Sequence, residues 1–176
     1  MNWKKVEQRL RDASTEAIRA FARDHPAETF YGFCFDCNAD YGEVGLSLNT
    51  EEDLWAHAAS HYPSYSQREV EGELRWSSGD WKYTGFNTDP PYAKAWEAAW
   101  EETQEAIHGA YIDDENAGVP RRFLESVCRV LIAMEKDGGL EPISRAEGFK
   151  TLVTDHNETN EDSWARLLRV RNRRRS

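Results

Sequence analysis

The stretch Asp155-His156-Asn157-Glu158 holds the residue types best suited to chemistry in this chain. It follows the apolar run FKTLVT, and loops that follow strands often carry functional residues. A histidine flanked by two carboxylates could act as a general base or ligate a metal ion. The chain has no G-x-S-x-G nucleophile motif and no glycine-rich phosphate loop to accompany it. A polar turn capping the next helix explains the same residues, so no catalytic residue is assigned.

Cys34 and Cys37 form a CxxC motif, a spacing used by zinc sites and redox-active dithiols. The motif lies inside a predicted strand, where residues three apart point to opposite faces. Redox-active pairs instead begin a helix, whose N-terminus lowers the thiol pKa. A zinc site needs two further ligands, and the remaining cysteine, Cys128, stands alone on a predicted helix. We therefore expect three buried, reduced cysteines.

His57 and His61 are four residues apart, so a helix would place both on one face, as metal-binding pairs require. The chain lacks the glutamate that follows the first histidine in zinc peptidases. Histidines on the surface near the end of a helix are the simpler interpretation. The sequence thus predicts neither a metal nor a cofactor.

An acidic turn joins the first two predicted strands. Asp36, Asn38 and Asp40 match the start of a calcium-binding loop. The match then fails, because Tyr41 replaces the required glycine and the final glutamate of such a loop is absent. Aspartate and asparagine are also common turn residues. We interpret this segment as a hairpin turn.

Aromatic and polar residues alternate between Trp76 and Phe86, including Asp80, Trp81 and Tyr83. Such a ribbon could form a binding platform, since tryptophan and tyrosine dominate binding hot spots. It could also be the inner face of two strands. The core interpretation is favoured.

The charge of the chain is strongly negative and unevenly distributed. The net charge is −10, but residues 165–176 carry six arginines and no acid, which leaves −16 on the remainder. Such an acidic body repels phosphate backbones, so nucleic acid is an unfavourable ligand. It attracts basic protein surfaces, chiefly by raising the association rate. Solubility alone is the favoured explanation of this charge.

Hydrophobic periodicity and turn residues predict an α+β domain. Its sheet is expected to be mostly antiparallel, with about five strands, packed by an N-terminal helix and two long central helices. The expected domain spans residues 1–170, and 171–176 would form a flexible basic tail. The first strand is apolar on both faces, which is typical of a central strand. The predicted helices are 2–24, 50–61, 89–113, 120–138 and 162–170, and the predicted strands are 29–37, 43–49, 71–76, 81–86 and 149–154.

The N-terminus lacks the apolar core of a signal peptide, because residues 1–10 are charged and amphipathic. No apolar run approaches the roughly 20 residues needed to cross a bilayer. Together with the odd number of cysteines, this predicts a cytoplasmic protein.

Two segments resemble a bacterial domain-of-unknown-function family, numbered 4303. They are AIRAFARDHPAETFYGFCFDCNADYGEVGLSLNTEEDL and LRWSSGDWKYTGFN. The resemblance spans roughly residues 5–168 and is weaker in the C-terminal third. It implies a small intracellular bacterial protein, of a kind sometimes found beside polymorphic-toxin genes as a candidate immunity protein. It carries over no catalytic residues.

The favoured hypothesis is a non-enzymatic binding protein that neutralises a basic toxin domain through an acidic surface. The residues expected on that surface are Asp36, Asp40, Glu43, Asp80 and Trp81.

Two alternatives remain open. One is a hydrolytic or metal-dependent enzyme using Asp155, His156 and Glu158, together with the two histidines of 50–61. The other is a structural subunit that self-associates through Trp96 and Trp100. No membrane partner is expected, and the oligomeric state is left open.

Overall fold

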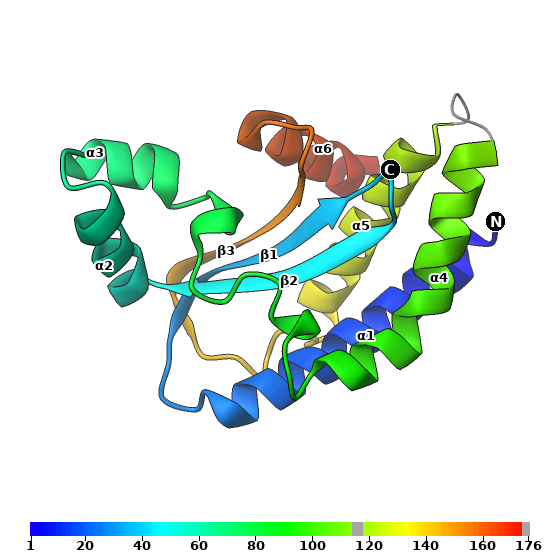
Figure 1. The fold of residues 1–176 in the computed structure, drawn as a ribbon, viewed down its shortest axis with the longest axis horizontal. Coiled ribbons are helices and arrows are strands. Elements are labelled where there is room, and N and C mark those ends of the chain that lie inside the picture. The colour runs from blue at the N-terminus through cyan, green and yellow to red at the C-terminus, as the bar shows by residue number, and fades with distance from the viewer. Residues whose placement is uncertain (114–117, 174–176) are drawn as a thin grey trace.

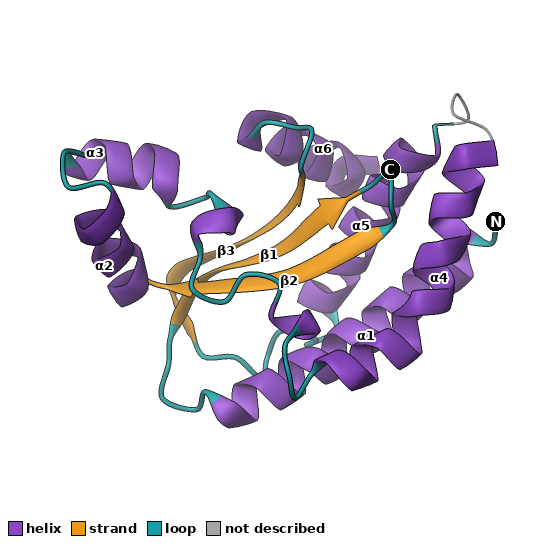
Figure 2. Cartoon of the chain, in the orientation of Figure 1, coloured by secondary structure: helices purple, strands orange, loops and turns teal. Residues whose placement is uncertain are grey.

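The computed structural model describes residues 1–113 and 118–173 (Figure 1). Helices surround a small sheet in this part of the chain (Figure 2). The elements are α1 (Trp3–Asp24), β1 (Phe30–Asn38), β2 (Glu43–Thr50), α2 (Glu51–His61), α3 (Gln67–Glu69), a π-helix (Val70–Leu74), two 3₁₀ turns (Ser78–Asp80 and Phe86–Thr88), α4 (Ala93–Asp113), α5 (Val119–Lys136), β3 (Arg145–Asp155) and α6 (Asn160–Arg173).

The sheet has three strands in the order β2-β1-β3 within the described residues. β2 pairs with β1 antiparallel as a hairpin, and β3 pairs with β1 parallel. Because β1 and β3 run in the same direction, their carboxyl ends meet at one edge, where Cys37 lies opposite Asp155. That edge positions the candidate site described below.

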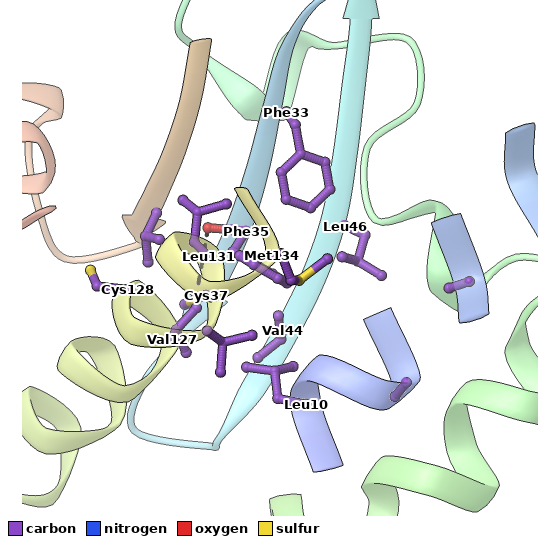
Figure 3. Close-up of a cluster of buried hydrophobic side chains, with 14 of the residues drawn as sticks. Leu10, Phe33, Phe35, Cys37, Val44, Leu46, Val127, Cys128, Leu131 and Met134 are labelled. Atoms are coloured by element: carbon purple, nitrogen blue, oxygen red, sulfur yellow. Dashed lines mark hydrogen bonds between the residues drawn. The ribbon is translucent and has the colours of Figure 1, made fainter. Parts of the chain in front are cut away.

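Both faces of β1 are covered, as its doubly apolar sequence predicts. On one face Phe33 and Phe35 join side chains from α1, α4 and α5, including Leu131, in the larger core (Figure 3). On the other face Cys34 lies in a smaller core formed with α2, the π-helix and Trp81. Each fully buried aromatic or aliphatic side chain contributes about 1.5–3 kcal/mol. These two cores hold the single sheet between two layers.

The sheet differs from the prediction in size and direction. The five-stranded, mostly antiparallel sheet is wrong, because the structure has a mixed sheet of three strands in its described part. Residues 71–76, predicted as a strand, lie in the π-helix and the turn after it. Residues 81–86 follow the edge of β2 but form only one isolated bridge, between Leu48 and Tyr83.

Local capping explains why residues 71–76 are not a strand. The Ser66 side chain accepts a hydrogen bond from the Glu69 backbone, and the Glu69 carboxylate accepts one from the Ser66 backbone. This capping box begins a helix, which continues through the π-helix. Val70 and Leu74, four residues apart, then share one buried face. The helical spacing of this apolar pair outweighs the strand-like alternation.

A side chain takes the place of a fourth strand along β2. Asn87 is fully buried, and its amide oxygen accepts the Leu46 N–H at 2.6 Å. Its amide nitrogen donates to the Val44 carbonyl at 3.0 Å. One asparagine therefore pairs with the edge of β2 as a neighbouring backbone would, and the sheet ends there.

The predicted boundary at residue 170 falls inside α6, which continues to Arg173. Arg171 Nη2 lies 2.6 Å from Glu135 Oε1 on α5, so the first residues of the predicted tail are docked. Residues 174–176 lie outside the described residues, as do 114–117 of the predicted loop between α4 and α5. The helices predicted around α1, α2, α4, α5 and α6 are confirmed.

Candidate functional site

A cleft of ≈ 600 Å³ opens beside the carboxyl ends of β1 and β3 and runs along α4. We call it the acidic cleft, because five of its lining side chains are carboxylates. They come from the β1–β2 hairpin and from α4. The lining residues are Asp36, Asn38, Glu43, Val44, Gly45, Thr84, Gly85, Thr88, Trp96, Glu97, Trp100, Glu101, Gln104, Glu105 and His156.

Helix α4 supplies three of the carboxylates. Glu97, Glu101 and Glu105 are spaced four residues apart, so they share one side of the helix. All three are exposed, while Trp96 and Trp100 on the neighbouring stripe are buried in the larger core. The amphipathic pattern of α4 thus fixes which face its acids present.

The β1–β2 turn fixes α4 against the hairpin. The Trp100 indole N–H donates to the Gly42 carbonyl at 3.1 Å. Gly42 has φ +67°, and a Cβ there would lie 2.8 Å from Ile107 Cβ. Only glycine adopts this conformation and leaves room for the helix. This contact holds α4 against the β1–β2 turn.

Asp36 is the most enclosed of the cleft carboxylates, with 16% of its side chain exposed. Its Oδ2 accepts the Ser78 hydroxyl at 3.0 Å, and its Oδ1 accepts the Thr154 hydroxyl at 3.4 Å. His156 Nε2 lies 3.5 Å from Oδ1. The parallel pairing of β1 and β3 brings these groups together across 120 residues of sequence.

The charged side chains that line the acidic cleft are almost all negative. None of its lining residues is a lysine or an arginine. Glu97, Glu101 and Glu105 form no ion pair with any described residue, whereas Glu102 on the same helix pairs with Arg9 at 3.0 Å. Carboxylates that converge from two structural elements without a cation create a local negative potential. A cationic group is the ligand that such a potential favours.

The residues of the alternative site separate in space. Asp155 is 8% exposed, and its Oδ1 accepts the Ala39 N–H at 2.9 Å. Glu158 forms an ion pair with the buried Arg166. Of the three, only His156 reaches the acidic cleft, where its neighbour is Asp36. The two acids of this loop are engaged in structural contacts.

The acidic cleft includes two of the five residues expected on a partner-binding surface, Asp36 and Glu43. Asp40 is half-buried, and its backbone carbonyl lies 3.0 Å from His108 Nδ1. Asp80 lines a different hollow and accepts the Ser77 hydroxyl at 2.7 Å. Trp81 is 4% exposed, and its indole N–H donates to a backbone carbonyl in the smaller core.

The cysteines are buried and unpaired, as predicted. Cys34 and Cys37 face opposite cores, which confirms the orientation expected within a strand. Burial raises the pKa of Cys34 to about 12 and that of Cys37 well above its ordinary value. Burial also raises the pKa of Cys128. These thiols therefore remain protonated and poorly nucleophilic at neutral pH.

The predicted histidine pair forms at the end of α2. The rings of His57 and His61 stack with centroids 4.3 Å apart. His57 Nε2 lies 3.4 Å from Asp80 Oδ1, far along the chain but adjacent in space. Among the described residues, no group of three or more histidines, cysteines and acids is arranged to hold a metal ion.

The glutamates of α4 are the site residues that the sequence analysis missed. Their signal was present, because Glu97, Glu101 and Glu105 recur every four residues beside a tryptophan stripe. Trp96 and Trp100, considered for self-association, are instead 6% and 1% exposed in the larger core.

Comparison with known protein families gives a match over residues 7–169, to a model described as a domain of unknown function, DUF4303. The chain belongs to the DUF4303 family. The match includes every residue that lines the acidic cleft and most residues of the two cores. No curated protein and no solved structure matches the chain significantly. Within the described residues no helix is both long and apolar enough to cross a membrane.

Proposed function

We propose that this chain is a cytoplasmic, non-enzymatic binding protein whose acidic cleft docks a basic protein surface. The single observation that carries the proposal is the convergence of five carboxylates around a cleft with no lysine or arginine in its lining. The most concrete form of this function is an immunity protein that neutralises a toxin domain. The resemblance to the DUF4303 family supports that form only through what it implies, a protein of a kind sometimes found beside polymorphic-toxin genes.

In this mechanism the acidic cleft covers a cationic face that the toxin uses to bind nucleic acid. Long-range electrostatic attraction raises the rate at which the two proteins meet. Carboxylates in a concave surface then contact the cationic side chains of the bound partner. Asp36 is the least exposed of these carboxylates and accepts hydrogen bonds from two hydroxyl groups, so it offers a pre-oriented acceptor. The exposed glutamates of α4 extend the contact along the helix.

A hydrolytic function for the Asp155-His156-Glu158 loop has less support, because its acids contact Ala39 and Arg166 and not His156. The alternative that remains is a general base formed by His156 with Asp36. Binding of a basic protein is a simpler function than catalysis for a cleft whose charged side chains are mainly carboxylates.

The test compares two neighbouring residues of α4 with the same charge. Glu101→Lys reverses a charge inside the acidic cleft, and Glu102→Lys reverses one outside it. Tagged wild-type protein and both variants are used to capture partners from the native host at low and high salt. We expect a basic partner that is lost at high salt and with Glu101→Lys but retained by Glu102→Lys.

Neutralisation is measured by expressing the captured partner in cells, with and without each form of this protein. We expect wild type and Glu102→Lys to restore growth and Glu101→Lys to fail. Equal behaviour of the two variants, or a partner held equally well at high salt, would contradict the use of this cleft.

A further inference from the structure

One ring nitrogen near the end of α2 is buried without a hydrogen-bond partner. It is His57 Nε2, which is sealed from solvent and makes no hydrogen bond with any described residue. Asp80 Oδ1 lies 3.4 Å away, which is the distance of an ion pair, but the two atoms do not form a hydrogen bond. Because a buried polar atom without a partner costs free energy, this nitrogen calls for a partner of another kind.

The distance between these two atoms is suited to two ligands of one metal ion. Zinc binds histidine nitrogen and aspartate oxygen at about 2.0–2.2 Å, in a tetrahedral arrangement. Two ligand atoms in that arrangement lie about 3.4 Å from each other. The other carboxylate oxygen of Asp80 accepts the Ser77 hydroxyl at 2.7 Å, which fixes the carboxylate and leaves Oδ1 beside the nitrogen.

His57 and Asp80 both line a hollow of ≈ 400 Å³ that shares no residue with the acidic cleft. His61 is exposed and lines the same hollow, and its ring stacks on that of His57 with centroids 4.3 Å apart. The His61 Nε2 atom makes no hydrogen bond with a described residue, so rotation of this ring would supply a third ligand. Zinc sites on helices use histidines spaced four residues apart, as these are.

The charges around this hollow are compatible with a bound cation. Lys82 also lines it, but its ammonium group lies 3.2 Å from Asp53 and 3.7 Å from Glu28. Two carboxylates therefore compensate one lysine, and Asp80 adds a further negative charge. Imidazole nitrogen is a donor that zinc, copper and nickel prefer over magnesium or calcium.

We propose that His57 and Asp80 form a binding site for a divalent transition-metal ion of the zinc class. His57 Nε2 and Asp80 Oδ1 are the two ligands already in position. His61 or water completes the coordination, since no group of three ligands is arranged beforehand among the described residues. The ion joins the end of α2 to the 3₁₀ turn Ser78–Asp80. This inference is independent of the proposed function, because the hollow lies outside the acidic cleft.

The test titrates the protein with Co²⁺, whose visible absorption reports its ligands, and then displaces Co²⁺ with Zn²⁺. We expect one saturable site for each chain. His57→Gln and Asp80→Asn should each weaken binding at least about tenfold, because even the loss of an outer partner of a metal ligand costs that much. His108→Gln is the matched control and should bind as the wild type does, since His108 contacts the Asp40 carbonyl away from this hollow.

A measurement on the wild type locates the ion without any substitution. Co²⁺ is paramagnetic and should broaden the ring signals of His57 before those of His156, which lines the acidic cleft. Zn²⁺ should also raise the midpoint of thermal unfolding of the wild type and of His108→Gln, but not that of His57→Gln. Unfolding of each variant without metal shows that it is folded.

Three results would overturn this site. They are no Co²⁺ binding by the wild type, equal binding by wild type and His57→Gln, and broadening of His156 before His57. The last result would place the ion in the acidic cleft instead.

Discussion

Carboxylates on the neighbouring helices α4 and α5 differ in whether they form ion pairs. On α5, Glu125 and Glu135 are paired with arginines of α5 and α6, at distances from 2.6 to 3.9 Å. On α4, Glu97, Glu101 and Glu105 have no such partners among the described residues. The chain carries 22 lysines and arginines, so cations are not scarce. Their distribution shows that the acids of α5 hold α6 in place, whereas those of α4 are left available.

The acids of α4 also repel one another. Like charges four residues apart on a helix destabilise it by about 0.2–0.5 kcal/mol for each pair. Glu97 with Glu101 and Glu101 with Glu105 form two such pairs. A bound cation would relieve both, so the stability of α4 is linked to occupancy of the acidic cleft.

The largest loss of stability is expected when a carboxylate loses its buried cationic partner. Arg166 is 4% exposed, pairs with Glu158 and donates to the Val153 carbonyl at 2.8 Å. Arg166→Ala leaves Glu158 without its cation and is expected to lower the free energy of unfolding by about 3 kcal/mol. Urea denaturation measures the change. Arg169→Ala, on the exposed side of α6, is the control and should change little; equal losses would show that the burial of this pair is not decisive.

A smaller loss of stability is expected at the contact between the β1–β2 turn and α4. Gly42→Ala adds a methyl group against Ile107 at a positive φ and should cost about 1–3 kcal/mol. Gly109→Ala is the matched control, because that position lies inside α4 with no heavy atom near a new Cβ. It should stabilise by up to about 1 kcal/mol through helix propensity. Thermal unfolding of both variants should therefore shift in opposite directions.

The smallest changes in stability are expected when one glutamate on each of the two helices is neutralised. Glu101→Gln removes repulsion on α4 and should raise the free energy of unfolding by a few tenths of a kcal/mol at low salt. Glu135→Gln removes an ion pair with Arg171 and should lower it by a similar amount. Both differences should shrink as salt is added. Two variants with the same sign would show that the glutamates of α4 are not destabilising.

The sequence was sufficient for the elements that are determined locally. The helix after Thr50 was predicted from its cap, and the Thr50 hydroxyl does accept the Asp53 N–H at 3.1 Å. The hairpin was predicted from its polar turn, and the central position of β1 from its two apolar faces. In each case the deciding interaction lies within a few residues of sequence.

The elements that were missed depend on distant contacts. The parallel pairing of β3 with β1 joins residues more than 110 positions apart, and no local pattern distinguishes it from antiparallel pairing. Asn87 looks like an ordinary turn residue until β2 lies beside it. For the candidate site, Asp36, Glu43 and His156 were identified separately. Their convergence, and the contribution of α4, needed the tertiary structure.

The asparagine that completes the edge of β2 has a consequence for the behaviour of the protein at high concentration. An open edge strand offers unpaired backbone groups to another molecule and promotes aggregation. Asn87 uses one buried amide to occupy those groups at Leu46 and Val44, without adding a strand that would itself present a new edge. Together with the bridge between Leu48 and Tyr83, this side chain protects the edge of β2 from strand exchange between molecules.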